Sequence, residues 1–314
     1  MKNFLLFLVG LLLVIVLSFG TIRPLFSPGF FPMHDDTQPA RIDQMAKSLI
    51  SGQFPVRIVG ELGYGFGYPL FNFYAPLPYY IGAFFNITGF DALAAAKIMF
   101  MIGIVLAGLS MFFLVKEIAG SQAALTSSIL YMYAPYHAVD IYVRGAAGEF
   151  YALGFLPLIL LGIIKITKPF YSSSPSTFAR DKLESRSLSR AKSRDLSSRQ
   201  ARTIRELKRG IIIGSIGIAG ILLSHNILGM ISGYFLGFIL ISYFVLLVMP
   251  NLFRHPFRVN LQDEPIGILK QVQDDRKSVK DSTNLFTFYF LLFTFFLGIG
   301  LSAFFTLPAV VEKK

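Results

Sequence analysis

Two adjacent carboxylates, Asp35 and Asp36, follow His34 after a stretch rich in proline and glycine. Neighbouring carboxylates repel each other when both are ionised, unless a cation or metal relieves them. The pair therefore suits a general base for an acceptor hydroxyl, or a ligand for a divalent metal such as Mg²⁺ or Mn²⁺. A structural alternative is that the acids favour the start of a helix, because residues 37–51 have helical spacing with Thr37 as a plausible cap.

A second group of ionisable side chains, His137, Asp140, Arg144 and Glu149, lies in a short stretch between two apolar segments. A guanidinium binds a phosphate in a bidentate manner, and a lipid phosphate would lie at this depth in a membrane. Arg144 is therefore a candidate phosphate-binding residue. The structural alternative is that Arg144 pairs with Asp140 or Glu149 and closes the loop, while His137 is an interfacial hydrogen-bonding residue.

Other polar residues could line the same site. His225 lies where two apolar segments meet, and it could bond the turn or point into a cavity. Arg57 and Glu61 belong to the same polar stretch as His34, and we assign all three to substrate binding. Lys97 lies about two turns into an apolar segment, from which it is expected to reach lipid headgroups.

Composition places these residues on a membrane protein. The chain has 314 residues, of which 54% are hydrophobic and 15% charged, and its mean hydropathy is +0.60. Globular proteins have about 45–50% apolar and about 25% charged residues. Soluble enzymes, nucleic-acid-binding modules and secreted scaffolds are thereby excluded. The absence of cysteine also excludes disulfides, thiolate metal sites and cysteine nucleophiles.

The predicted fold is an all-α integral membrane protein, a single polytopic domain over residues 1–314. We expect about seven transmembrane helices, with one or two juxtamembrane helices in an outer loop at 23–90. A helical span needs about 20 apolar residues. The predicted spans cover residues 4–22, 91–115, 119–136, 147–166, 210–223, 227–249 and 285–307. Residues 69–89 are apolar, but their prolines and paired aromatics are typical of an interfacial helix.

The distribution of charge predicts the orientation. Of the net charge of +11, most lies between Lys165 and Arg209, which contain thirteen Lys or Arg and four acidic residues. We interpret this stretch as a cytoplasmic loop that touches anionic membrane lipid, rather than as a segment that binds nucleic acid. The loops 167–209 and 250–284 are then cytoplasmic and disordered, with frayed helix as the alternative for residues 172–209. The N-terminus is also cytoplasmic. The acidic residues of the two candidate groups and three of the four histidines then lie at the outer face of the cell membrane.

Several stretches of the sequence resemble a known family. They are HDDTQPARIDQMAKSLISGQFPVR, GYGFGYPLFNFYAPLPYY, APYHAVDIYVRGAAGEFYALGFLPLIL, LLSHN and LSAFFTLPAVVE. They resemble bacterial membrane proteins labelled as related to 6-pyruvoyl-tetrahydropterin synthase, a label that implies no pterin chemistry, and the YfhO-like group. Both are similar to the polytopic C-type glycosyltransferase superfamily. Such relatives continue beyond the seventh span, so the resemblance implies that this chain is truncated at its C-terminus.

The resemblance implies transfer of a sugar from a polyprenyl-phosphate donor to a glycan, lipid or protein acceptor of the cell envelope. Asp35 and Asp36 match the acidic pair of the superfamily's first outer loop, where one carboxylate is a general base or metal contact. Arg144 would hold the donor phosphate, with His137 and His225 lining the cavity. A single displacement would invert the anomeric carbon. Two alternatives stay open, a transporter or flippase of lipid-linked substrates and an inactive remnant.

Overall fold

The computed structural model describes residues 2–29, 32–172, 190–249, 284–303 and 307. Within these residues the chain is helical and contains no strand, only an isolated bridge between Val59 and Tyr68. Six of the described helices are long and apolar enough to cross a membrane, as judged by length and composition. Their number indicates a multi-pass membrane protein.

The chain divides into two compact units. The first comprises residues 1–161, 215–232 and 298–314, and the second comprises residues 162–214 and 233–297. All of the predicted site residues belong to the first unit.

In the first unit, α1 (Lys2–Leu17) is almost entirely apolar and continues through α2 (Phe19–Ile22) into a 3₁₀ turn, η1 (Arg23–Phe26). Two contacts tie it to the next long helix. Lys116 lies 3.5 Å from the centre of the Phe7 ring, and the Lys97 ammonium donates to the Ser27 carbonyl at 2.6 Å. The first contact joins the start of α1 to a late turn of that helix, and the second joins the end of the N-terminal segment to its start. The two segments therefore run antiparallel.

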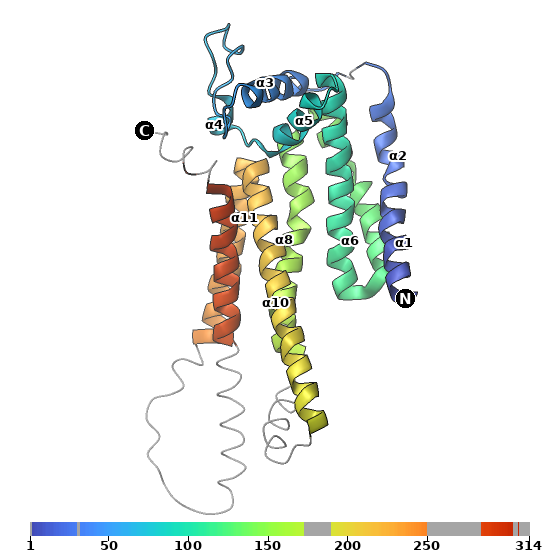
Figure 1. Cartoon of the computed structure of the whole chain (residues 1–314), viewed down its shortest axis with the longest axis vertical. Coiled ribbons are helices and arrows are strands. Elements are labelled where there is room, and N and C mark those ends of the chain that lie inside the picture. The colour runs from blue at the N-terminus through green and yellow to red at the C-terminus, as the bar shows by residue number, and fades with distance from the viewer. Residues whose placement is uncertain (1, 30–31, 173–189, 250–283, 304–306, 308–314) are drawn as a thin grey trace, which may run out of the picture. The chain divides into compact units, whose positions relative to one another are not determined.

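The helix α6 (Ala92–Met132) starts at Asp91, whose carboxylate accepts from the Ala94 amide at 2.8 Å. It is interrupted at Gly120, where φ is 85° and ψ is 180°. The chain turns back at this point of α6 (Figure 1), and its two arms pack closely, since a Cβ at Gly108 would collide with the Met132 sulfur. The segment predicted as two spans, 91–115 and 119–136, is therefore two helical arms joined at one glycine.

Between α1 and α6, three short helices lie across the end of the long ones (Figure 1). They are α3 (Gln38–Ile50), α4 (Leu70–Phe73) and α5 (Leu77–Ile87). At 1.5 Å per residue α5 is about 16 Å long, too short to cross a hydrocarbon core of about 30 Å. This length confirms the prediction that residues 69–89 do not form a spanning helix. The buried Ile42 of α3 packs against Gly82 of α5.

After α6 come α7 (Pro135–Val139), a π-helical turn, η2 (Asp140–Arg144), and α8 (Ala147–Ser172). The turn ends at Gly145, which is left-handed with φ 67° and ψ 26°. The first turns of α8 are anchored in the core, because Phe150 and Tyr151 are fully buried against Gly103 of α6.

The other long helices are α10 (Arg190–Ser224), α11 (Asn226–Tyr243) with the turn η3 (Phe244–Val248), and a helix over residues 284–303. In the second unit, Gly162 of α8 and Gly214 of α10 are in close contact, since a Cβ on Gly162 would lie 2.5 Å from the Gly214 Cα. Small residues let helix backbones approach in this way.

The described part of the basic loop is helical, which differs from the prediction of disorder and agrees with the alternative of a helix. Residues 167–172 continue α8, and residues 190–209 belong to α10. Their Arg, Lys, Gln, Ala and Leu residues have high helix propensity, and the adjoining span removes the cost of helix nucleation. Residues 173–189 and 250–283, predicted as loop, and 304–306, predicted as the end of a span, lie outside the described residues.

Candidate functional site

The acidic pair lies against the turn that contains Arg144. The His34 amide donates to the Val143 carbonyl at 2.8 Å, and the Asp35 amide donates to the Arg144 carbonyl at 2.9 Å. Gly145 makes this approach possible, because a Cβ there would lie 2.6 Å from the Asp35 carbonyl oxygen. Two segments that are far apart in the sequence are thus joined through their backbones.

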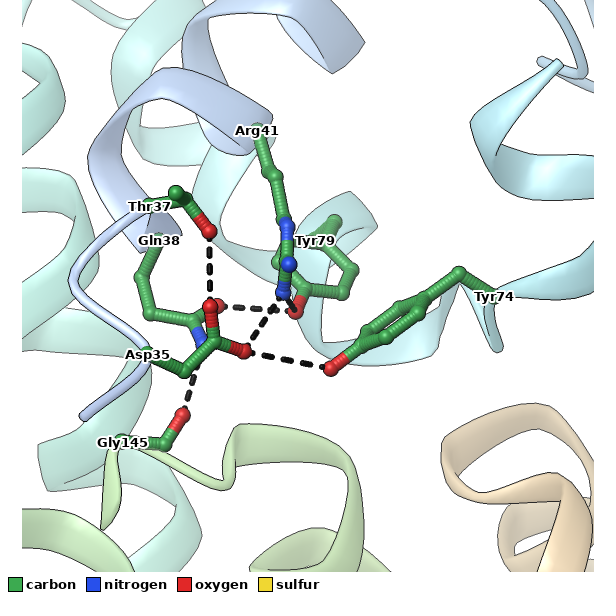
Figure 2. A network of polar contacts seen from close by, with 7 residues as sticks. All are labelled: Asp35, Thr37, Gln38, Arg41, Tyr74, Tyr79 and Gly145. Atoms are coloured by element: carbon green, nitrogen blue, oxygen red, sulfur yellow. Dashed lines mark hydrogen bonds and ion pairs between the residues drawn. The ribbon is translucent and has the colours of Figure 1, made fainter.

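The Asp35 carboxylate is surrounded by donors (Figure 2). Its Oδ1 accepts from the Thr37 hydroxyl at 2.7 Å. Its Oδ2 accepts from the Gln38 amide at 3.1 Å, from the Arg41 guanidinium at 2.8 Å and from the Tyr74 hydroxyl at 3.4 Å. A quarter of the Asp35 side chain remains exposed. The carboxylate is therefore held in place by α3 and still accessible from outside.

The partners of Asp35 are themselves fixed by two tyrosines. Arg41 lies over the Tyr74 ring, 4.5 Å from its centre, and donates to the Tyr79 hydroxyl at 3.1 Å. Tyr79 donates to the Gln38 side-chain oxygen at 2.8 Å, and Gln38 donates to the Gly145 carbonyl at 2.6 Å. Burial raises the pKa of Tyr79 well above its usual range, so this hydroxyl stays a donor. The network joins α3, α5 and the turn after η2.

Arg144 forms ion pairs within its own loop. It lies 2.7 Å from the Asp140 carboxylate and 2.8 Å from that of Glu149, and it donates to the Tyr136 hydroxyl at 3.2 Å. The Tyr136 hydroxyl in turn bonds Glu149. The alternative in which Arg144 pairs with acidic residues of its own loop is therefore present, with both Asp140 and Glu149 as partners. The side chain is nevertheless 43% exposed, so a ligand can reach it.

The two histidines predicted to line the cavity occupy different environments. His137 is buried in the core, with its ring centre 4.7 Å from that of Tyr131 and 5.4 Å from that of Phe150. His225 is half-buried between α10 and α11, where its Nδ1 accepts from the Leu228 amide at 3.1 Å. Burial lowers the pKa of His225. The negative charge of Glu149 opposes this shift, and the positive charge of Arg144 adds to it.

The remaining predicted residues are on the surface or in the following loop. His34 and Asp36 are exposed. Glu61 accepts from the Lys47 ammonium at 2.7 Å and from the Gln44 amide at 2.6 Å, and these bonds lower the pKa of Glu61. The Arg57 carbonyl accepts from an amide of α4. Glu61 thus anchors its loop to α3, whereas Asp35 and Arg144 are the predicted residues that the fold joins directly.

A divalent metal at the acidic pair does not fit this arrangement. The described residues contain no group of three or more His, Asp or Glu side chains that could hold a metal ion. Both Asp35 oxygens already accept hydrogen bonds, and Arg41 supplies the positive charge. Mg²⁺ is usually held through one or two carboxylates and several waters, so it would have to compete with the Arg41 guanidinium for the Asp35 oxygens. Asp35 is thus held as a hydrogen-bond acceptor by side chains of the protein itself.

Four residues of the site were not singled out by the sequence: Gln38, Arg41, Tyr74 and Tyr79. The spacing of Gln38 and Arg41 could have indicated that these two residues belong to the site. They are three residues apart on the first turns of the helix that follows Asp35, so they share the face nearest to it. The tyrosines lie in an aromatic-rich segment, and nothing in their spacing distinguishes them from core residues.

Comparison with protein-family models, curated proteins and solved structures found no match to this chain. The resemblance to C-type glycosyltransferases therefore stays a prediction that depends on the sequence stretches quoted above. Any function must be argued from the site itself.

Proposed function

We propose that this protein is a membrane glycosyltransferase that moves a sugar from a polyprenyl-phosphate donor to an acceptor hydroxyl at the outer face of the cell membrane. Counting the two arms of α6 separately gives seven crossings with a cytoplasmic N-terminus. This count is supported by the reversal at Gly120 and by the contact of Phe7 with Lys116 at the same end. Asp35 and Arg144 would then lie at the opposite, outer end.

The observation that carries the proposal is the junction between residues 34–35 and 143–144. It holds an accessible carboxylate and an accessible guanidinium on neighbouring segments. A sugar transfer from a lipid phosphate is accelerated by both groups, by a base for the attacking hydroxyl and by a cation for the leaving phosphate. General bases contribute about 10²–10⁴-fold to such rates.

In the proposed reaction, Asp35 accepts the proton of the acceptor hydroxyl as its oxygen attacks the anomeric carbon. The bond from that carbon to the donor phosphate breaks, and the phosphate leaves with the electron pair. Arg144 binds the leaving phosphate. Glu149 is the partner that the phosphate would displace, because it is 15% exposed while the Asp140 side chain is fully buried. Asp140 would remain to orient the guanidinium.

The two acids provide a matched pair of variants. We would measure transfer from radiolabelled polyprenyl-phosphate hexoses by the purified protein in lipid, with wild type, Asp35→Asn and Asp36→Asn. The Asp35 variant is expected to lose at least about 10²-fold in rate, and the Asp36 variant to stay within a few-fold, because Asp36 is exposed. Thermal unfolding of each variant shows whether a lost rate reflects lost structure.

Two results would contradict the proposal. One is the absence of transfer by the wild type from every donor in a panel of sugars. The other is a folded Asp35→Asn variant that keeps the wild-type rate, which would remove Asp35 from the chemistry. Equal losses in both variants would instead point to the general charge of the loop.

A further inference from the structure

One face of α10 in the second unit changes from basic to apolar within two turns. Arg205, Lys208 and Arg209 are exposed, and so is Ile212, whose side chain is 57% exposed. The spacings of three, four and seven residues from Arg205 place all four on one helix face. An isoleucine this exposed within a helix apolar enough to span is expected to contact lipid. The basic residues therefore face the same lipid.

The helix rise gives their depth. At 1.5 Å per residue, Arg209 lies about 4–5 Å and Arg205 about 10 Å from Ile212 along the axis. The headgroup region beyond the hydrocarbon is about 5–8 Å thick on each side of a bilayer. With Ile212 taken as the first side chain in the hydrocarbon, the three cations lie at, or just beyond, the level of the lipid phosphates.

The only acidic residue of α10 in this stretch, Glu206, is already paired. It lies 2.8 Å from the Lys165 ammonium of α8 and 2.9 Å from the Arg209 guanidinium. In the part of the chain that the structure describes, no carboxylate pairs with Arg205 or Lys208. Among the described residues, Glu206 therefore leaves the charge of Arg205 and Lys208 unbalanced while it holds α10 against α8.

We propose that Arg205, Lys208 and Arg209 form a binding site for the phosphate of an anionic phospholipid. The arginines supply bidentate donors and the lysine a point charge, while the acyl chain lies along the apolar face that begins at Ile212. The sequence alone predicts only that a long basic segment touches the membrane. The structure places three of the described cations on one helix face, and this site does not depend on the glycosyltransferase proposal.

The test uses the full chain in mixed micelles with a fluorescent phosphatidylglycerol, displaced by unlabelled phosphatidylglycerol or phosphatidylcholine. Wild type is compared with Arg205→Gln, with Arg205→Gln/Lys208→Gln and with Arg23→Gln. Arg23 is a matched control, since it is also exposed but lies in η1. Thermal unfolding in micelles without anionic lipid checks that each variant is folded.

We expect phosphatidylglycerol to compete better than phosphatidylcholine, and each charge removed from the site to weaken its binding about fivefold. Raising the salt concentration should weaken the wild type more than the double variant. Equal competition by the two lipids, or an equal loss in Arg23→Gln, would overturn the proposal. Displacement by glycerol phosphate at the same concentrations would also overturn it, because the site would then bind a free phosphate.

Discussion

Replacing Gly145 with alanine should separate the acidic pair from the Arg144 loop. Two effects add up at this position. A left-handed backbone costs a residue with a Cβ about 1–2 kcal/mol, and Gly145 has φ 67°. The Cβ would also lie 2.6 Å from the Asp35 carbonyl, which is backbone and has to move.

The movement would break the hydrogen bonds of His34 with Val143 and of Asp35 with Arg144, each worth about 0.5–1.5 kcal/mol. We therefore expect Gly145→Ala to destabilise the fold by about 2–5 kcal/mol. The matched control is Gly52→Ala. Gly52 has φ +88°, and a Cβ there would meet nothing within 4 Å. Only the backbone cost of about 1–2 kcal/mol applies to it.

The assay is thermal unfolding of both variants and wild type in the same detergent, followed by far-ultraviolet circular dichroism. Gly145→Ala should lower the midpoint clearly more than Gly52→Ala does. Equal shifts would refute the reasoning, because the close approach of Asp35 to the turn would then contribute nothing. If the proposed function also holds, Gly145→Ala should slow transfer at temperatures where it is still folded.

Three further predictions address the network, the pH dependence and the topology. Tyr79→Phe should cost about 1–3 kcal/mol by leaving the buried Gln38 oxygen without its donor, as thermal unfolding would show. Since burial lowers the pKa of His225, the unfolded chain binds its proton more readily. Stability should therefore fall as the pH drops below about 6.5, and less so in His225→Gln. Single cysteines at Ser27 and Ser198, both exposed, should react with an impermeant thiol reagent from opposite faces of a sealed vesicle, and labelling from one face would contradict the topology.

The long apolar helices could be predicted from the sequence because the bilayer imposes a length and a composition on each of them. Residues 69–89 were predicted not to form one long span, and the structure has two short helices there, since their prolines and aromatics interrupt a long helix within the chain itself. The helix at 190–209 was expected only as a frayed alternative to disorder. There the low apolar content indicated disorder, whereas local helix propensity and continuation from a span decide the structure.

Which polar residues meet was decided by the tertiary structure. The sequence identified Asp35 and Arg144 by residue type, but their junction depends on backbone hydrogen bonds and on the space left by Gly145. The contacts of Tyr79 with Arg41 and Gln38 likewise depend on how α3 and α5 pack. Local patterns in the sequence indicate which residues are buried and which share a helix face. Both properties depend mainly on residues that are close together in the chain. Contacts between distant segments depend on packing, and no spacing in the sequence encodes them.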